Sequence, residues 1–198
     1  VAAVITTRFP TAIRQGTVVA VGPGNNGGDG WVVARALGAL GLPVWVVPVG
    51  GSRTELNGLE ARLAAAAGIR QLDPDGPWPA AGLVVDAILG TGANGPPRPN
   101  VATLLARLGE LAVPVVAVDG PTGLDLDTGI SHDVLRATLT ITFGGYRRGQ
   151  LLARDEVGDL AVVDVGFVAP APEWSRLFVA RDAARAVPLL PCQSYKGD

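Results

Sequence analysis

Short apolar runs alternate with segments of helical periodicity along most of this chain. The runs are rich in valine and are bounded by glycine, proline or polar residues. This alternation is typical of βαβ units, whose parallel strands are covered by helices on both faces. It predicts an α/β fold, a three-layer α/β/α Rossmann-like domain with a mainly parallel central sheet. Strands are expected at 17–21, 44–49, 83–86, 115–119, 138–143, 160–165 and 177–180, and helices at 31–40, 55–67, 101–111 and 182–188.

One polar segment separates the first predicted strand from the first predicted helix. It reads Gly22-Pro23-Gly24-Asn25-Asn26-Gly27-Gly28-Asp29-Gly30. Its glycines let the backbone approach a ligand closely, and the backbone N–H groups at a helix N-terminus favour phosphate. Two amides and a carboxylate exceed what a phosphate loop needs, so they indicate a cation or a polar ring as well. A glycine-rich turn without a ligand is the competing interpretation.

The same segment matches the G-x-G-x-x-G dinucleotide pattern, which is a weak signal alone. In dinucleotide-binding folds, an acidic residue at the end of the second strand binds the ribose hydroxyls. Here the second strand is followed by Gly50-Gly51-Ser52-Arg53, which contains no acid. A hydride-transferring oxidoreductase is therefore disfavoured, although Arg53 is compatible with a phosphorylated ribose.

Two later strands end in aspartates, Asp86 and Asp119. A carboxylate at the end of an apolar strand is costly unless it is hydrogen-bonded, paired or bound to a cation. We therefore favour a functional role for both over capping of the loops that follow. The neutral oxygens of Asn26 and Thr122 suit a weakly held monovalent cation. Because open parallel sheets bind ligands beyond the carboxyl ends of their strands, these polar loops are expected to meet in one crevice.

Composition narrows the function classes further. The chain has 198 residues and a formal net charge of −2, with no basic stripe of the kind that nucleic-acid binding needs. No apolar run reaches membrane-spanning length, so no membrane contact is expected. The single cysteine, Cys192, excludes an internal disulfide and fits the cytoplasm. The only lysine is Lys196, so proton transfer within the domain is expected to fall to carboxylates, His132, hydroxyls or bound water, and His132 is set aside as a lone loop histidine.

Three motifs, in this order and spacing, resemble NAD(P)H-hydrate epimerase, the YjeF N-terminal domain. They are the segment 22–30, Val85-Asp86-Ala87-Ile88-Leu89-Gly90-Thr91-Gly92, and Ala117-Val118-Asp119-Gly120-Pro121-Thr122-Gly123-Leu124-Asp125. The resemblance assigns residues 1–190 to an epimerase domain whose N-terminus looks truncated. Gln193-Ser194-Tyr195-Lys196-Gly197-Asp198 resembles the opening of an ADP-dependent NAD(P)H-hydrate dehydratase, so 191–198 are expected to begin a second, cut-off domain.

The resemblance implies an isomerase that interconverts the R and S forms of hydrated NADH and NADPH in nicotinamide nucleotide repair. Potassium is the implied cation, bound by Asn26, Asp86 and Thr122. Asp119 is the expected catalytic residue, because the resemblance sets it at the nicotinamide end. The expected substrate-binding residues are Asn25, Asn26, Gly27, Gly28, Asp29, Gly90, Thr91, Gly92, Ala93, Asn94, Gly95, Pro96 and Asp119.

This sequence departs from the family's pattern at three places: Thr122 stands for the usual serine, Gly120 for isoleucine and Arg147 for lysine. The expected partner is the small-molecule substrate NAD(P)HX, with a C-terminal dehydratase domain in the longer protein; a homo-oligomer is compatible with the resemblance. A non-catalytic Rossmann-like nucleotide-binding or scaffold module is the alternative function. Such a module has no need for buried carboxylates, whereas the sequence keeps all three polar loops.

Overall fold

The apolar runs form the strands of one sheet. The computed structural model describes residues 1–166 of the chain. The helices are α1 (Ala2–Arg8), η1 (Ala12–Gln15), α2 (Asn25–Ala39), α3 (Glu55–Ala66), α4 (Pro99–Glu110), α5 (Arg148–Leu152) and α6 (Arg154–Val157). The strands are β1 (Thr17–Val21), β2 (Val44–Pro48), β3 (Arg70–Gln71), β4 (Leu83–Ala87), β5 (Val115–Val118), β6 (Leu139–Phe143) and β7 (Asp159–Val163). The strand expected at 177–180, the helix at 182–188 and the segment 191–198 lie outside the described residues.

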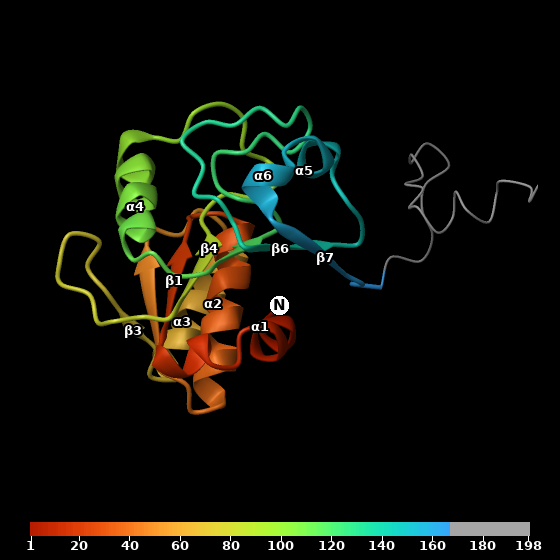
Figure 1. Ribbon diagram of the computed structural model, residues 1–198. Coiled ribbons are helices and arrows are strands. Elements are labelled where there is room, and N and C mark those ends of the chain that lie inside the picture. The colour runs from red at the N-terminus through yellow and green to blue at the C-terminus, as the bar shows by residue number, and fades with distance from the viewer. Residues whose placement is uncertain (167–198) are drawn as a thin grey trace, which may run out of the picture. The chain divides into compact units, whose positions relative to one another are not determined.

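The sheet has seven strands in the order β3-β2-β1-β4-β5-β6-β7, and every pair of neighbours runs parallel (Figure 1). This confirms the predicted Rossmann-like α/β fold. From β1 the chain builds β2 and β3 on one side, and then returns to build β4 to β7 on the other side. The strand order therefore reverses between β1 and β4, which is the place where open α/β sheets bind ligands.

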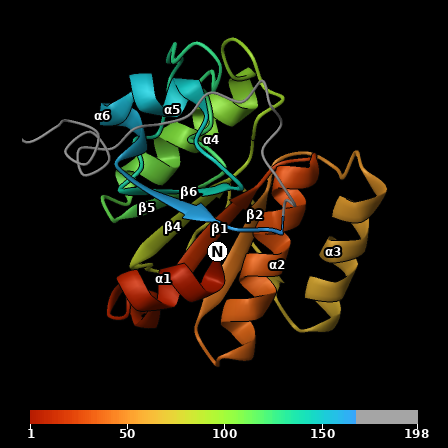
Figure 2. The ribbon, with the colours of Figure 1, turned by 90° about the vertical axis from the view of Figure 1, so that its right-hand side faces the viewer.

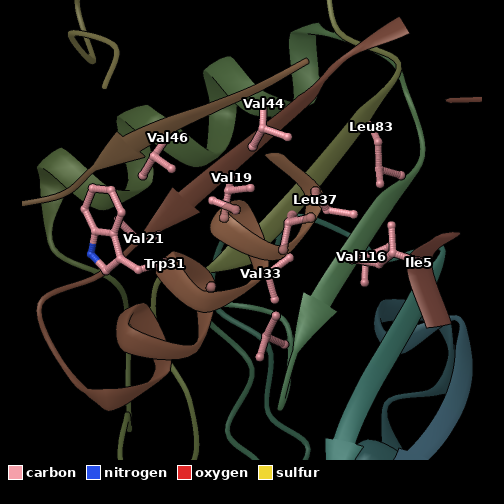
Figure 3. Close-up of a cluster of buried hydrophobic side chains, with 14 of the residues drawn as sticks. Ile5, Val19, Val21, Trp31, Val33, Leu37, Val44, Val46, Leu83 and Val116 are labelled. Carbon is pink, nitrogen blue, oxygen red and sulfur yellow. The ribbon is translucent and has the colours of Figure 1, made fainter. Parts of the chain in front are cut away.

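Alternate strand residues face opposite layers of helices, as expected for strands buried on both faces. On one face, Val19 and Val21 of β1 pack with Trp31 and Leu37 of α2 and with Ile5 of α1 (Figure 3). On the other face, β1 and β4 pack against α4, which lies across the sheet from α2 and α3 (Figures 1 and 2). The buried residues of α4 are spaced i, i+3, i+4 and i+7, so its apolar stripe faces the sheet; they are Val101, Leu104, Leu105 and Leu108.

The sequence placed the long strands to within two residues, but it missed several short elements. It gave no signal for α1, η1, β3, α5 or α6, which are too short to establish a period. The prediction that the first helix begins near residue 31 was wrong, because α2 begins at Asn25. Much of the predicted glycine loop is therefore the first turns of a helix. None of the helices within residues 1–166 is long and apolar enough to cross a membrane.

Candidate functional site

A hollow of about 430 Å³ lies at the reversal of strand order, between the loops that follow β1 and β4. Arg53, from the loop after β2, and Asp119, at the end of β5, also line it. An adjoining hollow of about 370 Å³ shares Pro23, Arg53, Leu89, Gly92 and Ala93 with the first. Both volumes fall in the range of small-molecule sites.

Most of the predicted substrate-binding residues meet in these two hollows. Those that line the 430 Å³ hollow are Asn25, Asn26, Asp29, Gly90, Thr91, Gly92, Ala93 and Asp119. Those that line the 370 Å³ hollow are Gly92, Ala93, Asn94, Gly95 and Pro96. Gly27 and Gly28 line neither hollow; they are buried in α2 beside Asn57 of α3.

Glycine has a low helix propensity, but the glycines of α2 lack side chains and so let this helix pack closely against its neighbours. A Cβ on Gly27 would overlap the carbonyl of Gly22, and one on Gly30 would lie 2.7 Å from the side chains of both Val21 and Ala87. The helix therefore packs against the loop and the sheet more closely than any larger residue would permit. Its N-cap residue, Gly24, supplies no side-chain acceptor to the first turn. The N-terminus of α2 consequently offers backbone N–H groups to an anion in the hollow.

Asn57 fixes the loop that precedes α2, and sequence reasoning missed it. Its Nδ2 donates to the carbonyl oxygens of Gly22, at 2.9 Å, and Gly24, at 2.5 Å. Its Oδ1 accepts from the Ser52 hydroxyl at 2.7 Å. The side chain is 1% exposed. The sequence feature that could have indicated Asn57 is its place on the buried side of α3, one turn after the Thr54 N-cap, where an apolar residue would be expected.

Asp86 is fully buried beneath the hollow, and Thr122 holds it from two directions. The Thr122 backbone N–H donates to Asp86 Oδ2 at 2.7 Å, and the Thr122 hydroxyl donates to Oδ1, also at 2.7 Å. The N–H of Ile88 also donates to Oδ1. Burial raises the pKa of the Asp86 carboxyl, and these hydrogen bonds only partly oppose that rise. No ion pair of Asp86 occurs among residues 1–166.

The polar atoms around Asp86 fit a monovalent cation. The Nδ2 atom of Asn26 is buried without a hydrogen-bond partner in residues 1–166, and the Oδ1 atom of the same amide is the one that can bind a cation. Gly90 leaves room for the amide, because a Cβ there would lie 3.1 Å from Asn26 Cγ. The set of one carboxylate, one amide and one hydroxyl is mostly neutral oxygen, which suits a hard ion of low charge. Residues 1–166 contain no group of three His, Cys, Asp or Glu that could bind a transition metal.

Asp119 is held in a left-handed backbone conformation, with φ of 66°. Aspartate adopts this region at modest cost, and residues so held often belong to functional sites. Its N–H donates to Ile141 O at 2.8 Å, and its own carbonyl accepts from Gln150 Nε2 at 2.6 Å. Its carboxylate accepts from the N–H of Thr91 at 3.3 Å and lies 3.4 Å from the Thr142 hydroxyl, whose single proton it shares with Gly145 O at 3.3 Å.

Gln150 is the second functional residue that sequence reasoning missed. It is fully buried in α5, and its Oε1 accepts from the N–H of Arg147 at 2.8 Å. Because its Nε2 also binds Asp119 O, one side chain couples α5 to the backbone of the predicted catalytic residue. The sequence contains no signal for it, since α5 has only five residues and lies far from Asp119 along the chain.

At Gly120, the space that a larger residue would occupy is taken by the Leu126 side chain.

Asp29 and Asp119 place two carboxylates in the same hollow. The residue surface of Asp29 is exposed, but atoms on the hollow side displace part of the water around its carboxyl. This desolvation raises the pKa of Asp29, and the negative charge of Asp119 raises it further. The hollow therefore holds two carboxyl groups, and that of Asp29 keeps its proton to a higher pH than an ordinary aspartate does.

Fold and site together define a Rossmann-like α/β class of domain, with its hollow at the reversal of strand order. The chain belongs to the family described as YjeF-related protein N-terminus, whose model matches residues 1–149.

Three relatives illustrate the similarity. The bifunctional NAD(P)H-hydrate repair enzyme Nnr of Pyrobaculum aerophilum is 40% identical over 173 residues, which cover 80% of this chain and 34% of that protein. The NAD(P)H-hydrate epimerase of Pirellula staleyi is 37% identical over 164 residues, covering 75% of this chain and 72% of that one. The crystal structure of yeast ynu0 superimposes with a TM-score of 0.72 at 27% identity, covering 85% of this chain and 76% of that one. The chain spans about a third of the length of the bifunctional relatives.

Proposed function

We propose that this domain interconverts the R and S epimers of hydrated NADH and NADPH, as the printed name of its Pirellula staleyi relative describes for that protein. The observation that carries the proposal is Asp119, a carboxylate that is held at a φ of 66° and lines the 430 Å³ hollow. Its oxygens are oriented by Thr91 and Thr142, and its backbone by Gln150. Such over-determination is expected of a group that must meet a reacting atom.

The reaction inverts the configuration of a single ring carbon, and it requires proton transfer to and from the oxygen bound to that carbon. Dihydronicotinamide is an enamine, so water adds at the carbon beside the ring nitrogen and leaves a hydroxyl there. The nitrogen lone pair can expel that hydroxyl when an acid protonates it as it leaves as water. Water then adds to either face of the resulting iminium carbon while a base removes its proton. Asp29 and Asp119 are the carboxyl groups available in the hollow for these two proton transfers.

The cation in this proposal is potassium, bound by Asn26, Asp86 and Thr122. When bound, it would supply positive charge beside the cleft and keep Asp86 ionised in its buried position. The fully buried Asp86 carboxylate supports this assignment, because a bound cation would compensate its charge. Asp86 then has a structural and electrostatic role, and the proton transfers remain with residues that line the hollow.

The first alternative function is a non-catalytic nucleotide-binding or scaffold module. The second, which has less support, is an oxidoreductase. A scaffold does not require two carboxylates in one hollow or an aspartate at positive φ. A dehydrogenase would be expected to bind the ribose diol with an acid after β2, where Arg53 stands. We also propose that the longer protein carries a dehydratase domain after this one, and that it works in the cytoplasm.

The test is direct. The chain is incubated with a single epimer of NADHX or NADPHX, and the two epimers are separated by chromatography over time. The proposal predicts faster approach to the epimer equilibrium than in a control without protein. A rate equal to that control would leave only nucleotide binding, and reduction or oxidation of the ring would favour the oxidoreductase.

A further inference from the structure

The two hollows of the cleft carry opposite charge. The 430 Å³ hollow is lined by Asp29 and Asp119, with Arg53 at its boundary. The 370 Å³ hollow is lined by Arg53 and Arg98, and none of its lining residues is acidic. Because Arg53 lines both, positive charge begins where the hollows meet and continues into the second one.

The change of charge from one hollow to the other runs across the sheet, from the end of β5 to the end of β2. The 370 Å³ hollow includes Val49, Gly50 and Gly51, which follow β2, whereas Asp119 follows β5. β2 and β5 lie on opposite sides of the β1–β4 junction. The N-terminus of α2, which attracts phosphate, lies between them. A dinucleotide with its pyrophosphate at α2 would therefore extend one nucleoside toward Asp119 and the other toward Arg53.

The chemistry at the end of β2 favours a phosphate over free hydroxyls. A ribose diol is usually bound there by a carboxylate that accepts from both hydroxyls, and an arginine accommodates a phosphate on the 2′ position. Here Gly50 and Gly51 lack side chains, and Arg53 is the first ionisable residue after the strand. Its backbone is fixed to the glycine loop, since the Arg53 N–H donates to Pro23 O at 2.8 Å.

Arg98 supplies the second cation from the opposite wall. It is the N-cap residue of α4, and the next residue, Pro99, begins the helix without an N–H. Neither the Arg53 nor the Arg98 guanidinium has a hydrogen bond or ion pair with any residue in the described range. Both groups retain all their donors for a ligand, and guanidinium binds phosphate with two parallel hydrogen bonds.

We propose that Arg53 and Arg98 form a subsite for the 2′-phosphate of the adenosine ribose, and that this subsite makes the domain prefer hydrated NADPH over hydrated NADH. The substrate side of this inference rests on the proposed function. The binding side does not, because it concerns an adenosine phosphate alone.

Binding is measured by calorimetry with adenosine 2′,5′-bisphosphate and with AMP, which differ only in the 2′-phosphate. The chain is expected to bind the bisphosphate at least tenfold more tightly than AMP. Arg53→Gln and Arg98→Gln should each reduce that preference by about tenfold, the size of one charged hydrogen-bond contact. Arg62→Gln is the matched control, since Arg62 is exposed on α3 and lines neither hollow.

Equal affinity of the unaltered chain for the two ligands would overturn the proposal, as would an undiminished preference in both variants. Kinetics provide the second readout: both variants should raise KM for hydrated NADPH more than KM for hydrated NADH. If the binding preference is present and sensitive to the arginines but no epimer interconversion occurs, the subsite stands and the proposed function fails. If interconversion occurs with no preference that depends on the arginines, the function stands and the subsite fails.

Discussion

At the scale of single residues, the two strand-end aspartates have opposite environments. Asp86 is fully buried and accepts hydrogen bonds from Thr122 and Ile88, so it cannot reach a substrate in the hollow. Asp119 is one residue beyond its strand, and its left-handed backbone turns the chain so that its carboxylate lines the hollow. The same residue type therefore fits a cation site in one place and proton transfer in the other.

Replacing Asp119 by asparagine tests its role in proton transfer. Asp119→Asn preserves shape and tolerates positive φ, but it cannot accept a proton as a base. We expect epimer interconversion to slow by about 10²–10⁴-fold, with the circular dichroism spectrum and nucleotide affinity retained. Asp127→Asn, in an exposed turn, is the control. Near-normal rates in Asp119→Asn would assign the proton to another group, with Asp29 as the first candidate.

Gln150 should affect turnover through Asp119. Gln150→Ala leaves the Asp119 carbonyl and the Arg147 N–H without their partner, so we expect a loss of about 1–3 kcal/mol in stability. Thr140→Val removes a comparable buried hydrogen bond, to Val157 O, that does not involve Asp119. A positioning role predicts that kcat falls more in Gln150→Ala than in Thr140→Val, with little change in KM. Equal kcat in the two variants would make Gln150 purely structural.

Asp29 should make folding stability depend on pH in a predictable direction. Desolvation and the Asp119 charge raise its pKa in the folded state, so Asp29 binds its proton more tightly when folded than when unfolded. Its contribution to stability is present below the unfolded value near 4 and is lost as pH rises through the folded value. Asp29→Asn should therefore raise Tm at about pH 7 and leave it unchanged at about pH 3. An equal shift at both values would point to packing instead of charge.

The sequence could point to Asp86 and Asp119 because each stands at the end of an apolar run, where a carboxylate requires a reason, and to Thr122 because it follows Asp119 closely. It could not predict Gln150 or Asn57. Each acts by donating to a main-chain carbonyl far away in the sequence, and such a contact leaves no local pattern. Their identity depends on how α3 and α5 pack, which is a property of the folded chain.

At the scale of elements, the start of α2 depends on a neighbouring helix. The sequence predicted a loop over 25–30 because glycine is a poor helix former. In the structure, Asn57 of α3 holds the carbonyls of Gly22 and Gly24, and the missing side chains of Gly27 and Gly30 allow close packing. Tertiary contacts therefore override local propensity at the first turns of α2, which line the 430 Å³ hollow.

Asn57→Ala should loosen the entry to α2. Two loop carbonyls would lose a buried donor, so we expect a stability loss of about 1–3 kcal/mol, measured by urea unfolding. Nucleotide affinity should fall as well, because the N–H groups of α2 lose their fixed direction. Ser52→Ala removes only the hydrogen bond to Asn57 Oδ1, and it is expected to cost less in both measurements. A full effect of Ser52→Ala with a weak effect of Asn57→Ala would contradict this order.

At the scale of the whole domain, the cleft forms because the strand order reverses between β1 and β4. The hydrophobic pattern predicted the strands and their parallel direction, but it does not encode their order across the sheet. The order pairs Asp86 of β4 with Ala20 of β1, the strand that leads into the Asn26 segment, and the Thr122 contact with Asp86 brings in the segment after β5. The candidate cation site therefore joins three βα units.

Potassium should consequently stabilise the domain as a unit. At a concentration about ten times its Kd, a cation that binds only the folded state adds about 1.4 kcal/mol. Exchanging potassium for tetramethylammonium should lower Tm and weaken substrate binding, and Asp86→Asn should abolish both differences. A Tm and an affinity that do not depend on the cation in the unaltered chain would remove potassium from the site.

The pairing of β1 with β4 also has a consequence for biosynthesis. Thr17 pairs with Leu83, so one edge of the central strand has no neighbour until the ribosome has produced β4. Asp119 and Gln150 are made later still. At translation rates of about 5–20 residues per second, the interval from the glycine segment to Gln150 is on the order of ten seconds. The nascent chain exposes the apolar edge of β1 until β4 has been made, and a complete site arises only later, after Asp119 and Gln150 have been added.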